Sequence, residues 1–232
     1  MKASMPRFPA SAYLDLSKTA HAALFAEGEE VWQVLPKLKD YLAANLKPGF
    51  HGKKIGAPWI GENVFIGEGT VVEPGAVIKG PAWIGAGCEI RAGAYIRENV
   101  IVGDGAVLGN SCEFKNALLF DGAQVPHYTY VGDSVLGHKA HLGAGVILSN
   151  FKLAGDEVVL RLANGETVRT GLRKFGAIVG DRAEVGCKVV LNPGSILGRD
   201  VLLYPGTVWH GVLPEATIVK HRPNYDLRPR RK

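Results

Sequence analysis

Large apolar residues recur at every sixth position between residues 60 and 120. The series is Ile60, Ile66, Val72, Ile78, Ile84, Ile90, Ile96, Val102, Leu108, Phe114 and Phe120. A period of six fits neither an amphipathic α-helix nor a single alternating strand. Many of these residues are followed by Gly, which allows the backbone to turn between short strands. The pattern therefore predicts an all-β fold, a parallel β-helix of hexapeptide repeats whose inward apolar side chains fill a prism.

The repeat has an interruption and a later restart. Val131 falls one residue early, and a shifted series continues through Leu136, Leu142 and Leu148. A third series is Val179, Val185, Leu191, Leu197, Leu203 and Trp209. We expect the β-helix to occupy residues 54–213 in about seven coils. The break is predicted at residues 121–130, and local rules fail most often at functional sites.

Three segments lie outside the regular repeat. Residues 1–53 are expected to form a tail and a helical cap, with a kink or restart at Pro36, packed on the end of the β-helix. Residues 151–177 form an insertion in which Asn164-Gly165 predicts the turn of a β-hairpin. Residues 214–232 form a basic C-terminal tail. We expect the hairpin to pack on a neighbouring subunit or over a ligand, because an isolated hairpin is only marginally stable.

Charge and cysteine content exclude several classes of protein. The formal net charge is +5, and residues 218–232 alone hold six Lys or Arg and one Asp. The rest of the chain is balanced, so it has no net attraction for nucleic acid. The three cysteines form no CxxC pair, which argues against a disulfide framework or a Cys-rich zinc site. No long apolar run or signal segment is present, so we expect a cytoplasmic protein without a membrane span.

His127 is the candidate catalytic residue within the predicted break. An imidazole has a pKa suited to general-base catalysis near neutral pH. On the residues alone, the spacing favours a surface histidine in a loop over a catalytic one. The basic tail is either a solvated terminus or a contact for a polyanion, such as a coenzyme phosphate, through Arg222.

Three stretches carry a resemblance to a known family: residues 108–117 (LGNSCEFKNA), 126–133 (PHYTYVGD) and 141–151 (HLGAGVILSNF). They resemble the acetyltransferase half of bifunctional glucosamine-1-phosphate acetyltransferase/N-acetylglucosamine-1-phosphate uridyltransferase. The resemblance implies a left-handed parallel β-helix, a homotrimer with active sites between subunits, and acetyl-CoA as the acyl donor. The sequence itself does not require a metal ion.

The resemblance also implies a role for each candidate residue. His127 corresponds to the family's general base. The residues implied at the acceptor site are Arg91, Lys115, Tyr130, His141, Asn150 and Lys174. Those implied along the acetyl-CoA channel are Ala144 and Cys187, where backbone N–H groups do much of the binding. The implied reaction is acyl transfer to an amino sugar, with cations holding a phosphate and a backbone amide stabilising the oxyanion.

Departures from the family pattern concern the acceptor. His141 stands where the family has Asn, Phe151 replaces Tyr, and the hairpin replaces a short loop. We therefore expect an amino sugar phosphate other than glucosamine-1-phosphate, or a sugar nucleotide. Residues 1–54 are too short for a nucleotidyltransferase domain and lack a Gly-rich nucleotide loop, so that activity is not expected of this chain.

Two alternatives from other functional classes stay open. His127, His138 and His141 are close in sequence, and three His ligands with an open position suit a catalytic zinc ion, as in β-helical carbonic anhydrases. The chain could also be a non-catalytic assembly or regulatory partner of a sugar nucleotidyltransferase.

Overall fold

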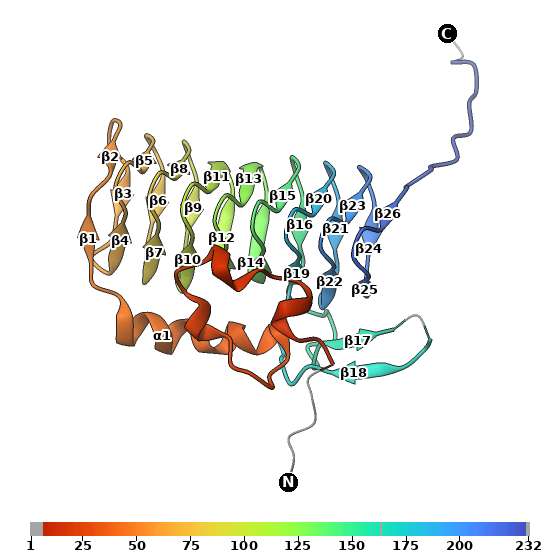
Figure 1. Ribbon diagram of the computed structural model, residues 1–232. Helices are drawn as coiled ribbons and strands as arrows, with labels where there is room; N and C mark the ends of the chain where they lie inside the picture. Colours follow the sequence, from red (N-terminus) through yellow and green to blue (C-terminus); the bar gives the residue numbers. More distant parts are fainter. Residues whose placement is uncertain (1–6, 163, 231–232) are drawn as a thin grey trace.

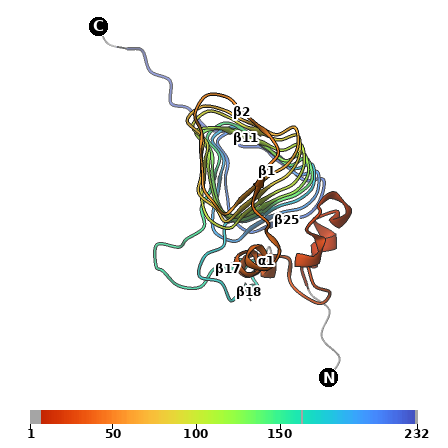
Figure 2. The same ribbon diagram turned by 90° about the vertical axis from the view of Figure 1, so that its left-hand side faces the viewer.

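Short strands wound around a triangular prism make up most of the chain (Figures 1 and 2). The structure is a computed structural model that describes residues 7–162 and 164–230. The coils contribute strands to three faces, and the strands of each face pair in parallel with those of the neighbouring coils. One face is a nine-stranded sheet, so the prism has nine coils where about seven were expected. The parallel β-helix predicted from the period of six is confirmed.

We name the faces by their strands. The nine-stranded face holds β2 (Lys53–Lys54), β5 (Val71–Val72), β8 (Glu89–Ile90), β11 (Val107–Asn110), β13 (Gln124–His127), β15 (His141–Leu142), β20 (Glu184–Val185), β23 (Leu202–Leu203) and β26 (Ile218–Val219). The third face holds β3 (Trp59–Ile60), β6 (Val77–Ile78), β9 (Tyr95–Ile96), β16 (Ile147–Leu148), β21 (Val190–Leu191), β24 (Val208–Trp209) and the first halves of β12 (Glu113–Leu119) and β14 (Tyr130–Leu136).

The remaining face, which we call the covered face, contains the second halves of β12 and β14. Its other strands are β1 (Gly49–Phe50), β4 (Val64–Ile66), β7 (Ala82–Ile84), β10 (Val100–Val102), β19 (Ala177–Val179), β22 (Ser195–Leu197) and β25 (Val212–Leu213). The β-helix therefore begins and ends slightly outside the expected limits of 54 and 213. The extra strands belong to the first and last coils, which lie beyond the strict sixfold series.

The break in the repeat comes from a shorter coil. Val100 pairs with Ala82 eighteen residues before it and with Ala117 seventeen residues after it. The inward side chains after Phe114 are consequently Ala117 and Leu119, and Phe120 faces outward into a second hydrophobic cluster. The expected break at residues 121–130 is thus wrong in position. One residue is lost earlier, where β12 bends from the third face onto the covered face.

A second apolar core lies on the outside of the covered face. The middle residues of its strands point away from the prism and are apolar: Trp83, Ile101, Leu118, Val135, Ile178, Ile196 and Val212. They pack against apolar side chains of the N-terminal segment (residues 7–45) and of the hairpin, including Trp32, Leu35 and Phe175, each no more than 2% exposed. This burial of apolar surface holds both segments on the prism.

The N-terminal segment consists of 3₁₀ turns followed by one α-helix. The turns are Ala10–Ala12, Leu16–Lys18, Ala22–Leu24 and Val31–Lys37, and the helix α1 is Leu38–Asn45. Pro36 lies in the last 3₁₀ turn, just before α1 starts. The segment runs along the covered face, whereas we had expected a cap on the end of the prism (Figure 1). That expectation is wrong because the apolar side chains of the segment pack against the outward apolar residues of the covered face, on the side of the coils.

The insertion contains the predicted hairpin. Strands β17 (Val159–Arg161) and β18 (Thr167–Arg169) pair in antiparallel fashion. In the turn, the side chain of Asn164 accepts a hydrogen bond of 3.0 Å from the backbone N–H of Glu166. The hairpin lies beside the N-terminal segment, outside the prism (Figure 2). Within this chain it packs on the N-terminal segment, so its expected contact with a neighbouring subunit or ligand stays a prediction.

Candidate functional site

The corner between the nine-stranded face and the third face carries the predicted base. His127 ends β13, and continuation of the strand register places Asn110, His127, Ala144 and Cys187 at equivalent positions of successive coils. Backbone hydrogen bonds join them: the N–H of Gly145 donates to the His127 carbonyl at 3.1 Å. Adjacent coils are about 4.8 Å apart. The structure therefore places Ala144 on the coil next to the predicted base and Cys187 one coil further along the same corner. We call this stack the His127 corner.

Backbone N–H groups are available along the His127 corner. Within the described part of the chain, the N–H groups of Ala144 and Cys187 donate to no acceptor, while that of Ala92 in an earlier coil donates to the Glu73 carboxylate at 2.8 Å. Cys187 is exposed. Free amides beside a base can bind carbonyl or oxyanion oxygens of a ligand.

Tyr128 follows His127 in a backbone conformation unusual for an aromatic residue. Its φ is 49°, and the equivalent positions of other coils, which also have positive φ, hold Gly93, Ser111, Gly145, Lys188 and Gly206. A bulky residue at positive φ costs about 1–2 kcal/mol, and such strain is concentrated at functional sites. The Tyr128 ring is 64% exposed, with its centroid 6.4 Å from that of His127. Sequence reasoning missed Tyr128, because other non-glycine residues occupy the same position of the repeat.

A buried carboxylate organises polar side chains where the third and covered faces meet. Asp133 is 4% exposed, and its φ of 45° accompanies the bend in β14. The Nδ2 atom of Asn116 donates to it at 2.9 Å, and Nζ of Lys115 lies 3.5 Å away. Asn150 donates to Asp133 and, at 3.2 Å, to the Tyr130 hydroxyl oxygen. Three predicted acceptor-site residues thus gather around an Asp that sequence reasoning missed. We call this group the Asp133 cluster.

Tyr130 keeps its phenolic proton available for a ligand. A carboxylate only accepts hydrogen bonds, so the amide nitrogen of Asn150 must face Asp133. The same nitrogen donates to the Tyr130 oxygen, which leaves the Tyr130 O–H free to donate elsewhere. Burial, followed by the charge of Asp133, raises the pKa of Tyr130. The phenol therefore stays protonated near neutral pH and can donate to a phosphate or a sugar hydroxyl.

This assignment predicts an observable titration. The tyrosinate absorbance that is lost on Tyr130→Phe should develop with a midpoint above pH 10, because burial and Asp133 both disfavour the charged phenolate. The measurement is a difference between the ultraviolet pH titrations of parent and variant. A missing step centred at or below pH 10 would contradict the described environment.

Arg91 and His141 lie on the nine-stranded face, away from the Asp133 cluster. Arg91 pairs with Glu89 at 2.8 Å, and Nδ1 of His141 lies 2.8 Å from the Glu184 carboxylate. His141 and Glu184 line a shallow pocket of about 340 Å³ that also includes Cys187. Sequence reasoning had no signal for Glu184, which meets His141 through strand pairing between distant parts of the chain.

The two predicted phosphate-binding cations do not converge within one chain. Arg91 projects from the nine-stranded face, and Lys115 lies on the third face next to Asp133. The His127 corner separates these faces. In the described structure each of the two side chains has a different acidic partner, Glu89 for Arg91 and Asp133 for Lys115.

The last two predicted residues lie at the margins. Lys174 is exposed at the base of the hairpin, where it forms an antiparallel bridge with Phe151. Arg222 belongs to the exposed tail, which leaves the last coil and extends away from the prism (Figure 1). In the described structure Arg222 therefore does not join the other site residues, and its contact with a coenzyme phosphate stays a prediction.

The three histidines considered for zinc occupy separate places. His138 lies next to the covered face, where its Nδ1 bonds the Asp121 carbonyl oxygen at 2.7 Å. His127 is on the opposite edge of the nine-stranded face, and His141 is engaged by Glu184. Among residues 7–162 and 164–230, no group of three His, Cys, Asp or Glu side chains is arranged to hold a metal ion.

Residues 78–170 match the sequence family described as the GMPPB C-terminal domain. A bifunctional sugar-1-phosphate nucleotidylyltransferase/acetyltransferase from Sulfurisphaera tokodaii is 34% identical over 96 residues, 41% of this chain and 24% of the relative. The resemblance to hexapeptide-repeat acyltransferases is confirmed. An uncharacterized acetyltransferase, YaiX from Escherichia coli, is 35% identical over 105 residues, 45% of each chain. The chain thus spans about a quarter to under half of these relatives.

Among solved structures, a UDP-N-acetylglucosamine acyltransferase from Campylobacter jejuni is 15% identical, with a TM-score of 0.31. The match covers 72% of this chain and 69% of that chain. The described helices of the present structure include none with the length and apolar character needed to cross a membrane.

Proposed function

We propose that this chain is an acetyl-CoA-dependent N-acetyltransferase acting on an amino sugar phosphate or a sugar nucleotide. The observation that carries the proposal is the stacking of His127, Ala144 and Cys187 on successive coils. This arrangement sets a candidate base beside free backbone amides. The name of the Sulfurisphaera tokodaii relative combines sugar-1-phosphate nucleotidylyl transfer with acetyl transfer, and YaiX is named an acetyltransferase, which supports the same activity.

The proposed reaction uses the side chains in distinct roles. The acceptor amine attacks the thioester carbonyl, neutral His127 takes the proton from the nitrogen, and the C–S bond breaks to release coenzyme A. The released thiolate takes up the proton from His127, which restores the neutral imidazole. A backbone amide at the His127 corner, such as that of Ala144, stabilises the negative oxygen formed in between. General-base catalysis of this kind contributes about 10²–10⁴ in rate.

The Asp133 cluster is the proposed binding region for the acceptor. It offers the free O–H of Tyr130 and the ammonium of Lys115, which lies 3.5 Å from Asp133 where the third and covered faces meet. Tyr130 is only three residues beyond His127, across a single corner. Arg91 reaches the acceptor in this proposal from a second copy, because it projects from the other face. The separation of Arg91 from Lys115 thus supports a site between subunits, and a homotrimer is the assembly we propose.

The proposal is tested by measuring coenzyme A release from acetyl-CoA with a panel of amino sugar phosphates and amino sugar nucleotides. We expect release with at least one amine, and a product heavier by one acetyl group. The matched control is the same sugar with a hydroxyl in place of the amine, which should not react. Absence of transfer to every amine in the panel would contradict the proposal and favour a non-catalytic assembly partner.

A further inference from the structure

A second polar pocket lies at the foot of the hairpin, apart from the His127 corner. It has a volume of about 220 Å³ and lies between β17 and the coils that contain β21 and β24. Its lining residues are Lys152, Val159, Arg161, Asn192, Pro193 and His210. Figure 1 shows the hairpin next to these C-terminal coils. The inserted segment therefore does more than cover the apolar face, because it completes a cavity.

The chemistry of this pocket is one-sided. Its lining has three basic side chains and an amide, and no carboxylate. Lys152 is partly neutralised by Asp156, whose carboxylate lies 2.8 Å from Nζ. Arg161 forms no ion pair with any residue of the described chain. The pocket therefore has an uncompensated positive charge.

His210 reports this positive charge. Burial, then the charge of Arg161 and of Lys152, lowers the pKa of the His210 imidazole. Each of the two charged neighbours that act on it is a cation. An anion in the pocket would reverse their effect and favour the imidazolium form.

Strand register relates the pocket to the Asp133 cluster. On the third face, Gly132, Ser149, Asn192 and His210 occupy equivalent positions of successive coils. Asn192 is thus two coils from Gly132, or about 10 Å along the prism. Gly132 lies directly under the Tyr130 side chain, since a Cβ atom there would lie 2.4 Å from the Tyr130 hydroxyl. The pocket and the Asp133 cluster therefore share one face.

We propose that the pocket formed by Lys152, Arg161, Asn192 and His210 binds a phosphate or diphosphate group of an organic ligand. The volume is below the range of about 300–1,000 Å³ usual for whole-ligand sites, so the pocket fits a charged group and not a complete nucleotide. Arg suits phosphate because its planar fork donates two parallel hydrogen bonds. The phosphate belongs either to a sugar nucleotide acceptor or to the coenzyme. The choice between these two ligands rests on the proposed function, whereas the binding of a phosphate does not.

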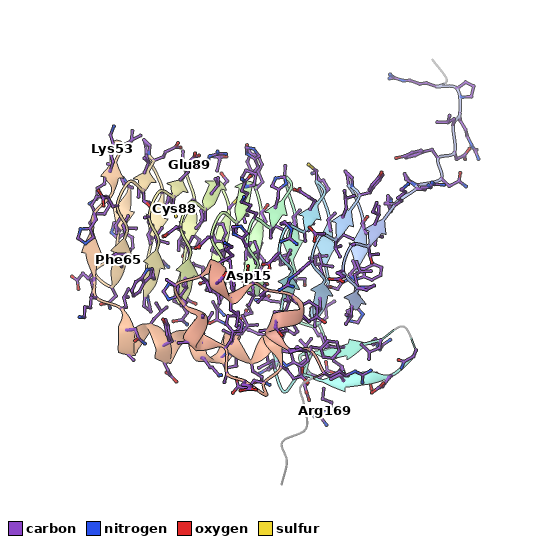
Figure 3. All side chains as sticks on the ribbon, in the orientation of Figure 1. Asp15, Lys53, Phe65, Cys88, Glu89 and Arg169 are labelled. Atoms are coloured by element: carbon purple, nitrogen blue, oxygen red, sulfur yellow. The ribbon has the colours of Figure 1, made fainter. Side chains whose placement is uncertain are left out.

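Binding of inorganic pyrophosphate to the full chain tests the proposal by calorimetry. We expect saturable binding, weakened at least about tenfold by Arg161→Ala, which removes a cation, and by His210→Gln, which removes a side chain that can become a cation. The matched control is Arg169→Ala. Arg169 is on the same hairpin but pairs with Glu157 and does not line the pocket. It lies on the opposite side of the molecule from Glu89 (Figure 3).

Further measurements identify the site and the source of the phosphate. Pyrophosphate should raise the pKa of His210. The titration is measured on the imidazole proton resonance of the parent, which is assigned to His210 because it is missing in His210→Gln. Weaker binding of UDP to Arg161→Ala, with coenzyme A binding unchanged, assigns the group to the acceptor; the reverse pattern assigns it to the coenzyme. No binding of pyrophosphate to the parent, or equal binding by parent and both pocket variants, would overturn the proposal. Acetyl transfer is not measured here, so either proposal can fail alone.

Discussion

Replacing His127 with Ala should lower acetyl transfer by about 10²–10⁴ while leaving folding intact. The side chain is exposed at the end of β13, and its backbone carbonyl, which accepts from Gly145, is unaffected by the substitution. Loss of the base removes the proton acceptor for the attacking amine and leaves substrate binding largely in place. The measurement is kcat for the best acceptor, together with the thermal unfolding midpoint.

The matched control is His51→Ala. His51 is also an exposed histidine, but it lies in the first coil, far along the prism from the His127 corner. We expect this variant to retain parental activity. Equal activity of His127→Ala and the parent would remove His127 from the mechanism, whatever the effect on stability.

Replacing Trp32 with Ala should detach the N-terminal segment and the hairpin from the prism. Trp32 is 1% exposed, its Nε1 donates to the Thr170 carbonyl at 3.2 Å, and its ring lies between Phe8 and Phe175 with centroids 5.4 and 6.0 Å away. A buried Trp→Ala change typically costs about 3–5 kcal/mol. Each coil contacts mainly its neighbours, so we expect the inner core of the prism to stay folded.

Hydrogen exchange distinguishes this local effect from global unfolding. Amides in residues 31–42 and 167–172 should lose protection in Trp32→Ala, while those of β11 and β13 should keep it. Trp59→Ala is the control, because Trp59 is 56% exposed on β3 and its removal should cost little. Uniform loss of protection through all coils would show that the second core is not a separate unit.

The sixfold period predicted the β-helix because each coil repeats the same inward contacts. The period could not show what packs against the outer surface of a face. The triplet Val100-Ile101-Val102 contains that information, since three consecutive apolar residues in a strand mean that both sides are buried. In the structure Ile101 points into the second core, while Val100 and Val102 fill the prism. Such triplets indicate that a side face is covered, but they do not show which segment covers it.

The same limit applies to the candidate site. His127, Ala144 and Cys187 are far apart in sequence, and their roles were implied by the resemblance; the register then stacked them on one corner. Asp133 escaped prediction because its importance comes from burial beside Lys115 across a strand pair. A shortened coil brings these two together, and the sequence showed only that one residue was missing somewhere before Val131.

The most direct test of the account is a crystal structure of the protein with coenzyme A bound. We predict that the thiol end of the coenzyme lies beside the His127 side chain, with pantetheine carbonyl oxygens accepting from the backbone amides of Ala144 and Cys187. A coenzyme bound elsewhere on the prism, with its thiol remote from the His127 corner, would contradict the proposed site and the mechanism built on it.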